Sequence, residues 1–245
     1  GGNVAGDQSV AIGTEALLVQ NPSGNVDMNN VAVGYRAGYA VTTGTLNTII
    51  GALAGDALTV GNSNTAVGQN ALSLDTQGDL NTAIGIGALQ SQNFTSTTDS
   101  YNTAVGGFAG GSNTTGQTNT FVGGLAGNKN TTASNNVAIG NDALSTNTTG
   151  AQNTAVGKQA LMRSTTSSNN TAVGFTALDH NTTGSENTAV GRDALSANTT
   201  AANNVAVGYQ ALLTNTEGAQ NTAVGWNALR ATTTGDDNVA VGKRA

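Results

Sequence analysis

A valine or isoleucine followed by glycine recurs along the whole chain at a nearly constant spacing. With the glycine of each regularly spaced copy as position zero, which leaves out Gly61 and Gly87, successive positions lie 17 residues apart in eleven intervals and 21 residues apart in two. The longer intervals, Gly13–Gly34 and Gly85–Gly106, each carry a four-residue insertion, and the only proline, Pro22, lies in the first. A fixed short period indicates structural units that stack on one another. The fourteen zero positions are Gly13, Gly34, Gly51, Gly68, Gly85, Gly106, Gly123, Gly140, Gly157, Gly174, Gly191, Gly208, Gly225 and Gly242.

The residues before each glycine alternate as a β-strand does. In Asn-Thr-Ala-Val-Gly, positions −3 and −1 lie on one face of a strand and position −2 lies on the other. Position −3 is always Thr or Val and position −1 is always Val or Ile. Because these are the larger apolar groups, we expect them to point inward. The predicted core column at −1 is Ile12, Val33, Ile50, Val67, Ile84, Val105, Val122, Ile139, Val156, Val173, Val190, Val207, Val224 and Val241.

The other columns complete one turn of a thin coil. Position +3 is Ala in every copy and position +4 is Leu in nine, so this second segment is expected to close the core. Glycine at zero, and often at +10, is expected to supply turns with positive φ. Position −4 is Asn in thirteen copies, whose amides are expected to bond from turn to turn. This predicted ladder is Asn30, Asn47, Asn64, Asn81, Asn102, Asn119, Asn136, Asn153, Asn170, Asn187, Asn204, Asn221 and Asn238.

A helical repeat does not fit this pattern, because two glycines in 17 residues would each cost a helix interior about 1 kcal/mol. The sequence predicts an all-β parallel β-solenoid, or β-roll, of fourteen stacked 17-residue repeats, two of them lengthened. We expect a single continuous array over residues 1–245, and a segment of a longer chain.

Composition narrows the function further. Only 9% of residues are charged, with eight Lys and Arg and a net charge of −6, which disfavours binding to nucleic acid because phosphates need clustered cations. No apolar stretch approaches the ~20 residues that span a bilayer, so we expect no membrane insertion in this segment. The chain has no cysteine, which excludes disulfides and thiolate metal sites.

Candidate chemistry is sparse. His180 is the only histidine, and we interpret it as a solvated turn residue rather than a catalytic or metal-binding group. We therefore predict no catalytic residue, no cofactor, no metal and no enzyme activity. Sequons recur at position +7, where asparagine suits a turn; the alternative is glycosylation on an accessible ridge. They are Asn113, Asn130, Asn147, Asn181 and Asn198.

Two short stretches resemble a known family. Ser9-Val10-Ala11-Ile12-Gly13 and Asn136-Val137-Ala138-Ile139-Gly140, each followed by x-x-Ala, resemble the head repeats of trimeric autotransporter adhesins. The repeated Asn-Thr-Ala-Val-Gly…Ala-Leu is also similar to shafts of bacteriophage tail fibres. The resemblance covers the whole chain, although the adhesin heads have a shorter period. It implies a left-handed roll and a homotrimeric adhesive fibre, extracellular on a bacterial or virion surface, with a carbohydrate or protein receptor.

A strip of small residues at position −2 fits such a trimer. If position −2 points outward, this strip allows close packing between chains. The predicted trimer interface is Ala32, Ile49, Ala66, Ala83, Ala104, Phe121, Ala138, Ala155, Ala172, Ala189, Ala206, Ala223 and Ala240. Aromatic residues at +1 form a second stripe, which fits either packing between subunits or carbohydrate binding: Tyr35, Phe175, Tyr209 and Trp226.

Two further functions stay open. Threonine at +8, from Thr42 to Thr233, and in part at +9, could form ranks that organise water, as in an ice-binding solenoid. The truncated repeats at both ends also fit a subunit of an extracellular filament.

Overall fold

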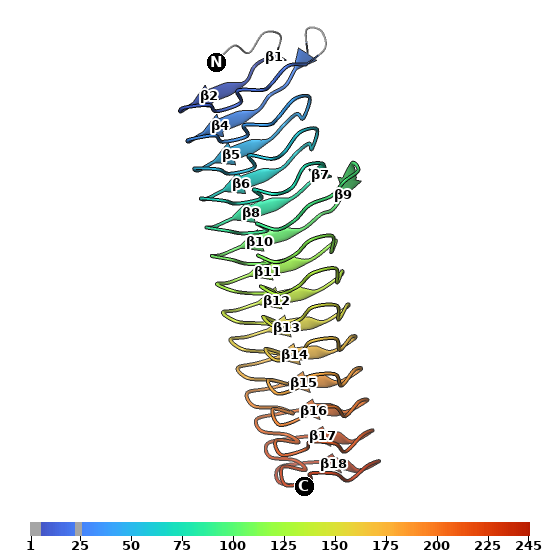
Figure 1. The fold of residues 1–245 in the computed structure, drawn as a ribbon. Helices are drawn as coiled ribbons and strands as arrows, with labels where there is room; N and C mark the ends of the chain where they lie inside the picture. Colours follow the sequence, from blue (N-terminus) through green and yellow to red (C-terminus); the bar gives the residue numbers. More distant parts are fainter. Residues whose placement is uncertain (1–5, 23–25) are drawn as a thin grey trace. The chain divides into compact units, whose positions relative to one another are not determined.

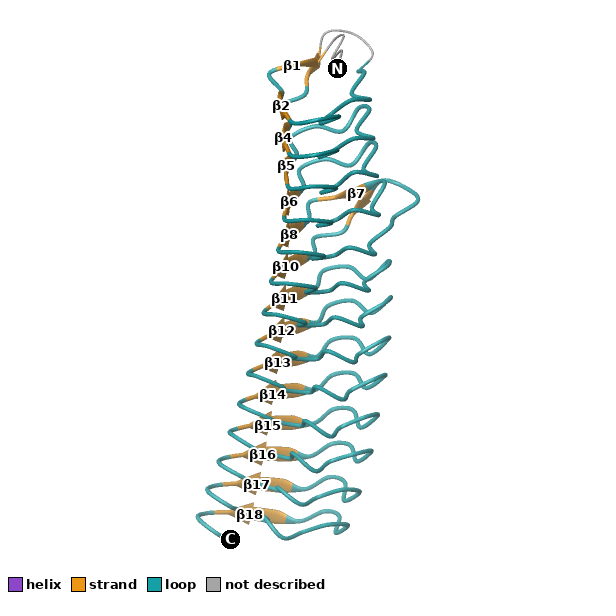
Figure 2. Ribbon diagram, turned by 60° about the vertical axis from the view of Figure 1, so that its left-hand side comes forward, coloured by secondary structure: helices purple, strands orange, loops and turns teal. Residues whose placement is uncertain are grey.

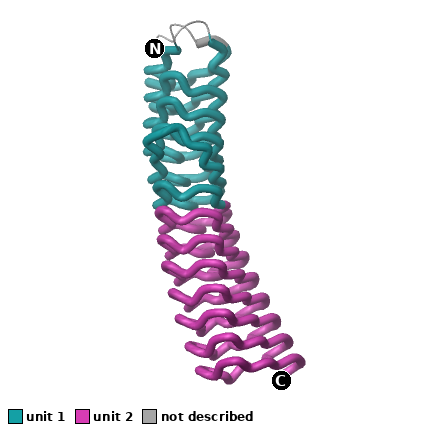
Figure 3. Tube along the Cα trace, turned by 90° about the vertical axis from the view of Figure 1, so that its right-hand side faces the viewer, with its two compact units in different colours: residues 1–119 teal, residues 120–245 magenta. Residues whose placement is uncertain are grey.

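The computed structural model describes residues 6–22 and 26–245, and within them every regular element is a β-strand. A three-residue strand precedes each zero glycine, and each strand pairs in parallel with its neighbour one repeat away (Figure 1). This arrangement is the predicted parallel β-solenoid. The chain divides into two compact units, residues 1–119 and residues 120–245, which carry the same repeat (Figure 3).

Unit 1 contains the two lengthened repeats. Six strands pair in the order β2-β4-β5-β6-β8-β10, and four two-residue strands form the separate pairs β1-β3 and β7-β9 (Figure 2). The second insertion leads into β9, whereas residues 23–25 of the first insertion lie outside the described residues. The strands are β1 (Gly6–Asp7), β2 (Val10–Ile12), β3 (Val26–Asp27), β4 (Val31–Val33), β5 (Thr48–Ile50), β6 (Thr65–Val67), β7 (Gly78–Asp79), β8 (Thr82–Ile84), β9 (Thr98–Asp99) and β10 (Thr103–Val105).

Unit 2 is the regular part of the chain. Its eight strands pair consecutively and in strict register, so that equivalent positions of successive repeats stand side by side. They are β11 (Thr120–Val122), β12 (Val137–Ile139), β13 (Thr154–Val156), β14 (Thr171–Val173), β15 (Thr188–Val190), β16 (Val205–Val207), β17 (Thr222–Val224) and β18 (Val239–Val241).

The corner after each strand requires glycine. The zero glycines have φ from 125° to 139°, as predicted, and a Cβ at Gly174 would lie 2.5 Å from the carbonyl oxygen of Gly191. The prediction for position +10 is wrong, because the glycines there lack positive φ. They are needed for close approach instead: a Cβ at Gly61 would lie 2.5 Å from the carbonyl oxygen of Gly78.

The predicted core column at −1 is wrong. None of its fourteen side chains, from Ile12 to Val241, is buried, and all lie in the described part of the chain. Ile50 is 38% exposed and Val190 is 36% exposed. The interior is too narrow for β-branched side chains opposite leucine, so positions −3 and −1 together face outward.

The predicted trimer interface at −2 is therefore wrong as well. Twelve of its thirteen residues, from Ala32 to Ala223, are fully buried inside the solenoid, and Ala240 in the last strand is partly buried. The small alanine is needed because it packs across the interior from the second segment, where twelve of the fourteen alanines at +3 and eight of the nine leucines at +4 are buried.

The leucines at +4 adopt strained backbone conformations. Leu144 and Leu161 have φ of 51° and 50°, in the left-handed region. That conformation costs an ordinary residue roughly 1–2 kcal/mol, while complete burial of leucine contributes roughly 1.5–3 kcal/mol. Burial thus offsets the strain, and the inward leucine makes the tight turn tolerable.

The predicted asparagine ladder at −4 is confirmed. The backbone N–H and the amide Nδ2 of Asn47 both donate to Oδ1 of Asn30, at 2.9 and 3.2 Å, and Nδ2 also donates to the carbonyl of Gly61 at 2.8 Å. Asn187 and Asn204 repeat the ladder contacts in unit 2. Each amide thus links adjacent turns and bridges the interior, which satisfies polar groups that burial would otherwise leave unpaired.

A second ladder, which sequence reasoning missed, follows position +7. Asn147 donates to Oδ1 of Asn130 at 2.9 Å, and Asn198 donates to Oδ1 of Asn181 at 2.8 Å. The five sequon asparagines are all 0% exposed. Each also bonds the backbone of its own turn, as expected of a turn residue: Nδ2 of Asn147 donates to the carbonyl of Gly150 at 2.8 Å. An accessible glycosylation site does not fit them, because their side chains lie in the interior of the folded chain.

Candidate functional site

The outward side chains at −3 and −1 form what we call the sheet face. In all fourteen repeats they are Thr, Val or Ile, so the face carries no charge. Their strict register places identical groups one strand apart, about 4.8 Å. The result in each unit is a row of half-exposed, β-branched side chains without a covering element among the described residues.

Threonine at +8, where sequence reasoning placed a water-organising rank, does not present its hydroxyl to solvent. Oγ1 of Thr165 donates to the carbonyl of Thr182 at 3.2 Å, and Oγ1 of Thr182 donates to that of Thr199 at 3.0 Å. These hydroxyls hold successive turns together. Outward threonines stand instead at +9, where Thr166 and Thr183 are exposed, and at −3, on the sheet face, where they are half-exposed.

Unit 2 carries a second surface, which we call the cation–aromatic ridge. It consists of the six consecutive side chains at +1, all exposed: Lys158, Phe175, Arg192, Tyr209, Trp226 and Lys243. The rings of Tyr209 and Trp226 stack with centroids 6.2 Å apart at 11°. Tyr35 occupies the same column in unit 1, but its neighbours there are Thr14 and Ala52, so the stripe is interrupted.

Cations cover the ring faces of the ridge. The guanidinium of Arg192 lies 5.7 Å from the ring centre of Phe175 and 5.9 Å from that of Tyr209. The ammonium of Lys243 lies 5.2 Å from the ring centre of Trp226. Nε of Arg192 also pairs with a carboxylate oxygen of Asp193 at 3.3 Å, which fixes the guanidinium between the rings.

His180 is exposed on a turn, as expected. Its Nδ1 lies 3.3 Å from Oδ2 of Asp179 and 3.1 Å from the carbonyl oxygen of Ser196. Burial raises the pKa of Asp179, while the nearby His180 and Arg163 lower it. Within the described residues, no group of three or more His, Asp or Glu side chains is close enough to hold a metal ion.

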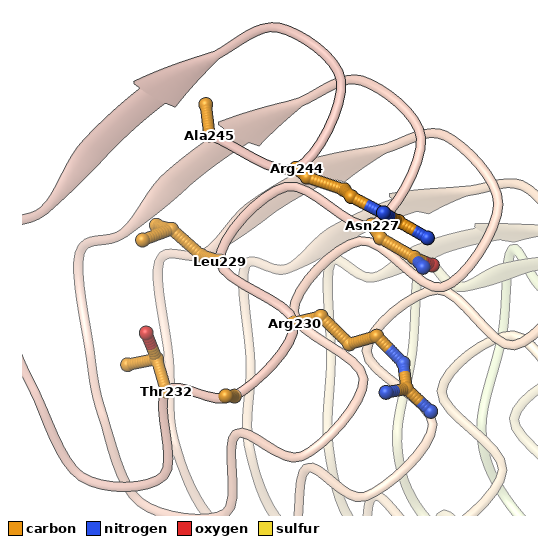
Figure 4. Close-up of a pocket in the computed structure, with 7 residues that line it drawn as sticks. Asn227, Leu229, Arg230, Thr232, Arg244 and Ala245 are labelled. Atoms are coloured by element: carbon orange, nitrogen blue, oxygen red, sulfur yellow. The ribbon is translucent and has the colours of Figure 1, made fainter.

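A hollow lies beside the last turn of unit 2 (Figure 4). Its wall includes Leu229, Thr232 and Ala245, with Arg230 and Arg244 at its side. Leu229 stands at +4, where other turns are covered by the next repeat. The hollow therefore lies on the stacked core itself, at the last turn of the described residues, and we assign no ligand to it.

Comparison with family models, with curated proteins and with solved structures finds no match to this chain. Among residues 6–22 and 26–245 there is also no helix of the length and hydropathy needed to cross a membrane. The sheet face and the ridge are therefore the features that bear on function, because a solenoid fold by itself serves many functions.

Proposed function

We propose that this chain is a structural segment of an adhesive fibre whose copies associate, as a homotrimer, through the sheet face. The observation that carries the proposal is the uncharged row of outward Thr, Val and Ile in both units. A long apolar surface of this kind normally marks an interaction site. An extracellular position on a bacterial or virion surface, and attachment to a receptor, rest on the family resemblance.

A second copy of the chain is the occupant that fits this face best. The net charge of −6 falls in unit 1, so two copies aligned side by side would repel each other through the acidic surfaces of that unit. The sheet face brings no charge into contact. Its regular register also lets the rows of one copy fit between those of another along the full length of a unit.

The decisive measurement is the mass in solution by light scattering over a range of concentrations. We expect a constant mass of three chains. Lysine substitutions at Val156 and Val190, both on the sheet face, should reduce the mass to one chain without loss of the β-sheet circular dichroism signal. The matched control places lysines at Thr166 and Thr183, which are exposed on turns away from the strands.

Other masses would change the assignment. A single chain at every concentration would overturn the trimer, and open-ended growth would favour a filament subunit. A control pair that dissociates the assembly as completely as the sheet-face pair would show that added charge, rather than the sheet face, controls association.

Ice binding is the second candidate, and a specific observation favours it. The outward threonines at −3 form a regular rank beside the valines at −1, as in Thr154, Thr171 and Thr188 on consecutive strands. We expect a monomer of this kind to show thermal hysteresis, and Thr171→Lys with Thr188→Lys to abolish it. The absence of hysteresis and of ice shaping in the unmodified protein would exclude this function.

A further inference from the structure

The cation–aromatic ridge is concentrated in one part of an acidic protein. Three of the eight Lys and Arg residues stand in its single column, at Lys158, Arg192 and Lys243. Two more cations flank its end: the guanidinium of Arg244 lies 4.9 Å from the ring centre of Trp226, and Nε of Arg230 donates to Oε1 of Gln210 at 3.2 Å. The ridge and its flank thus carry five cations in unit 2, beside the carboxylate of Asp193 that pairs with Arg192.

The orientation of the rings determines what the ridge presents to solvent. Tyr209 and Trp226 stack on each other, and cations lie over the remaining faces, so the faces are occupied within the protein. Trp226 is 39% exposed and Phe175 is 43% exposed. With a ring on one face and a cation on the other, Tyr209 and Trp226 have the ring edge left for a ligand, and that edge carries partial positive charge. Edges and cations together attract anionic groups, whereas neutral sugars stack on open ring faces.

Neighbouring polar groups hold the ridge in one arrangement. The carboxylate of Asp193 pairs with Nε of Arg192, and it accepts hydrogen bonds from Oγ1 of Thr176 and from Nε2 of Gln210, at 2.5 and 3.3 Å. The ion pair uses Nε, which leaves the two terminal nitrogens of the guanidinium as donors for a ligand. A fixed fork of this kind suits bidentate binding of a carboxylate or sulfate.

We propose that the ridge binds a linear polysaccharide that carries carboxylate or sulfate groups. The ridge repeats with each turn, about 4.8 Å, so a polymer lying along it meets a cation every two to three turns. Nucleic acid fits less well, because its bases would need the ring faces that are already covered. A second copy also fits less well, since the acidic residues of unit 1 stand at different positions of the repeat and form no matching row.

A bound polysaccharide would be the ligand of the adhesive segment proposed above. Binding at the ridge does not require the chains to associate, so it is tested by a measurement other than the mass in solution. Trp226 is the only tryptophan, so its fluorescence reports on the ridge alone. We expect polygalacturonate and dextran sulfate to change the emission in a saturable, salt-sensitive way, and neutral dextran to leave it unchanged. The response to the two anionic polymers distinguishes a preference for carboxylate from one for sulfate.

Two matched pairs of variants test the site. Arg192→Gln with Lys243→Gln removes two charges from the ridge, while Lys129→Gln with Arg163→Gln removes two exposed charges elsewhere in unit 2. We expect the ridge pair to weaken binding about tenfold for each cation, the loss typical of one charge-assisted hydrogen bond. The control pair should bind as the unmodified protein does, and both pairs should keep the same melting temperature within a few degrees.

Several outcomes would overturn the proposal. They are no response to either anionic polymer, equal losses in the ridge and control pairs, and a stronger response to single-stranded DNA than to the polysaccharides. Tyr209→Leu adds an independent check, because it removes the ring beneath Arg192 and keeps all charges. It should weaken binding less than the loss of the cations but more than the control pair does.

Discussion

The two units have the same repeat but differ in charge and regularity. Unit 1 has seven acidic residues and one basic residue, a net charge of −6, whereas unit 2 has seven of each. Unit 1 also contains both insertions and the two-residue strand pairs, while unit 2 stacks turns of constant length. The backbone corner and the asparagine ladder at −4 are shared, so these are the features that define the solenoid.

The interiors of both units reach the same volume in more than one way; in unit 2, Phe121 at −2 accompanies Gly127 at +4, where a Cβ would collide with the phenyl ring. In unit 1, Ile49 replaces alanine at −2, glycine replaces leucine at +4 in Gly38 and Gly55, and Val41 and Leu58 replace asparagine at +7. A Cβ at Gly38 would lie 2.9 Å from Cδ1 of Ile49, so the larger side chain occupies the space left by the missing leucine. The fold fixes the total volume of each turn, and several combinations of side chains fill it.

The largest loss of stability is expected at the corner glycines, which both units share. Gly174→Ala in unit 2 and Gly51→Ala in unit 1 each place a Cβ 2.5–2.6 Å from the next carbonyl oxygen, at φ of 139° and 134°. Backbone strain and the collision together should cost about 3 kcal/mol or more at either site. Thermal unfolding followed by circular dichroism measures this loss. A mild effect in one unit alone would show that the corner is not a shared requirement.

The next largest loss of stability is expected where a large side chain at −2 occupies the space of a missing leucine at +4. Gly55→Leu should destabilise unit 1 by about 2 kcal/mol through overpacking against Ile49. Adding Ile49→Ala should recover most of this loss, because Leu72 already adopts the same backbone conformation at +4, with φ of 54°. Denaturant unfolding of the two single variants and the double variant forms a cycle that isolates the coupling. If the two substitutions changed the free energy of unfolding additively, Ile49 and the residue at position 55 would not share the same space.

Substitutions in the polar ladder at +7 should cause a smaller loss of stability. Asn198→Leu in unit 2 should cost about 1–2 kcal/mol, because it leaves Oδ1 of Asn181 buried without the donor it now has at 2.8 Å. Replacing three consecutive asparagines, Asn181, Asn198 and Asn215, should cost less than three times as much, as unit 1 already stacks Val41 on Leu58 in this column. The exposed Asn141→Leu is the control, and urea midpoints measure the series.

The period, the strands and the ladder at −4 were predictable because glycine, alternation and invariant asparagine each have a local cause. Which face of each strand is buried was not predictable from side-chain size, because the larger side chains at −3 and −1 face outward. The alternation of side chains along the strand does indicate the buried face. Asn30 at −4 and Ala32 at −2 lie on the same side of the strand, so an asparagine ladder in the interior requires alanine in the interior as well. The pairing of Ile49 with Gly38 and Gly55 is a second signal, since only packed positions exchange volume.

The candidate surfaces were predictable only in part. The aromatic column at +1 is visible in the sequence, but its interleaving with Arg192 and Lys243 becomes meaningful only once successive turns are known to be adjacent. The burial of the sequon asparagines could not be inferred from turn propensity, because that propensity describes the local backbone and not the direction of the side chain.

The smallest change in stability is expected from the carboxyl group of Asp79, in unit 1. Asp79 is nearly buried, and burial raises its pKa above the ordinary value of 3.8, against hydrogen bonds from Asn62 that lower it; the charges of Asp99 and Asp75 raise it further. The folded state therefore keeps a proton that the unfolded chain has already lost, so stability falls as pH rises from the unfolded value through the folded one.

Asp79→Asn removes this dependence while keeping the contact, because an amide oxygen can accept the N–H of Asn62 that Oδ1 of Asp79 now accepts at 2.6 Å. We expect the variant to be slightly more stable than the unmodified protein near pH 7 and to match it near pH 3, where the aspartate is protonated in both states. Asp142→Asn, at a partly exposed position of unit 2, is the control and should change neither value. A stability that rises with pH in the unmodified protein and not in Asp79→Asn would reverse the sign, and would mean that the hydrogen bonds to the carboxylate outweigh its burial.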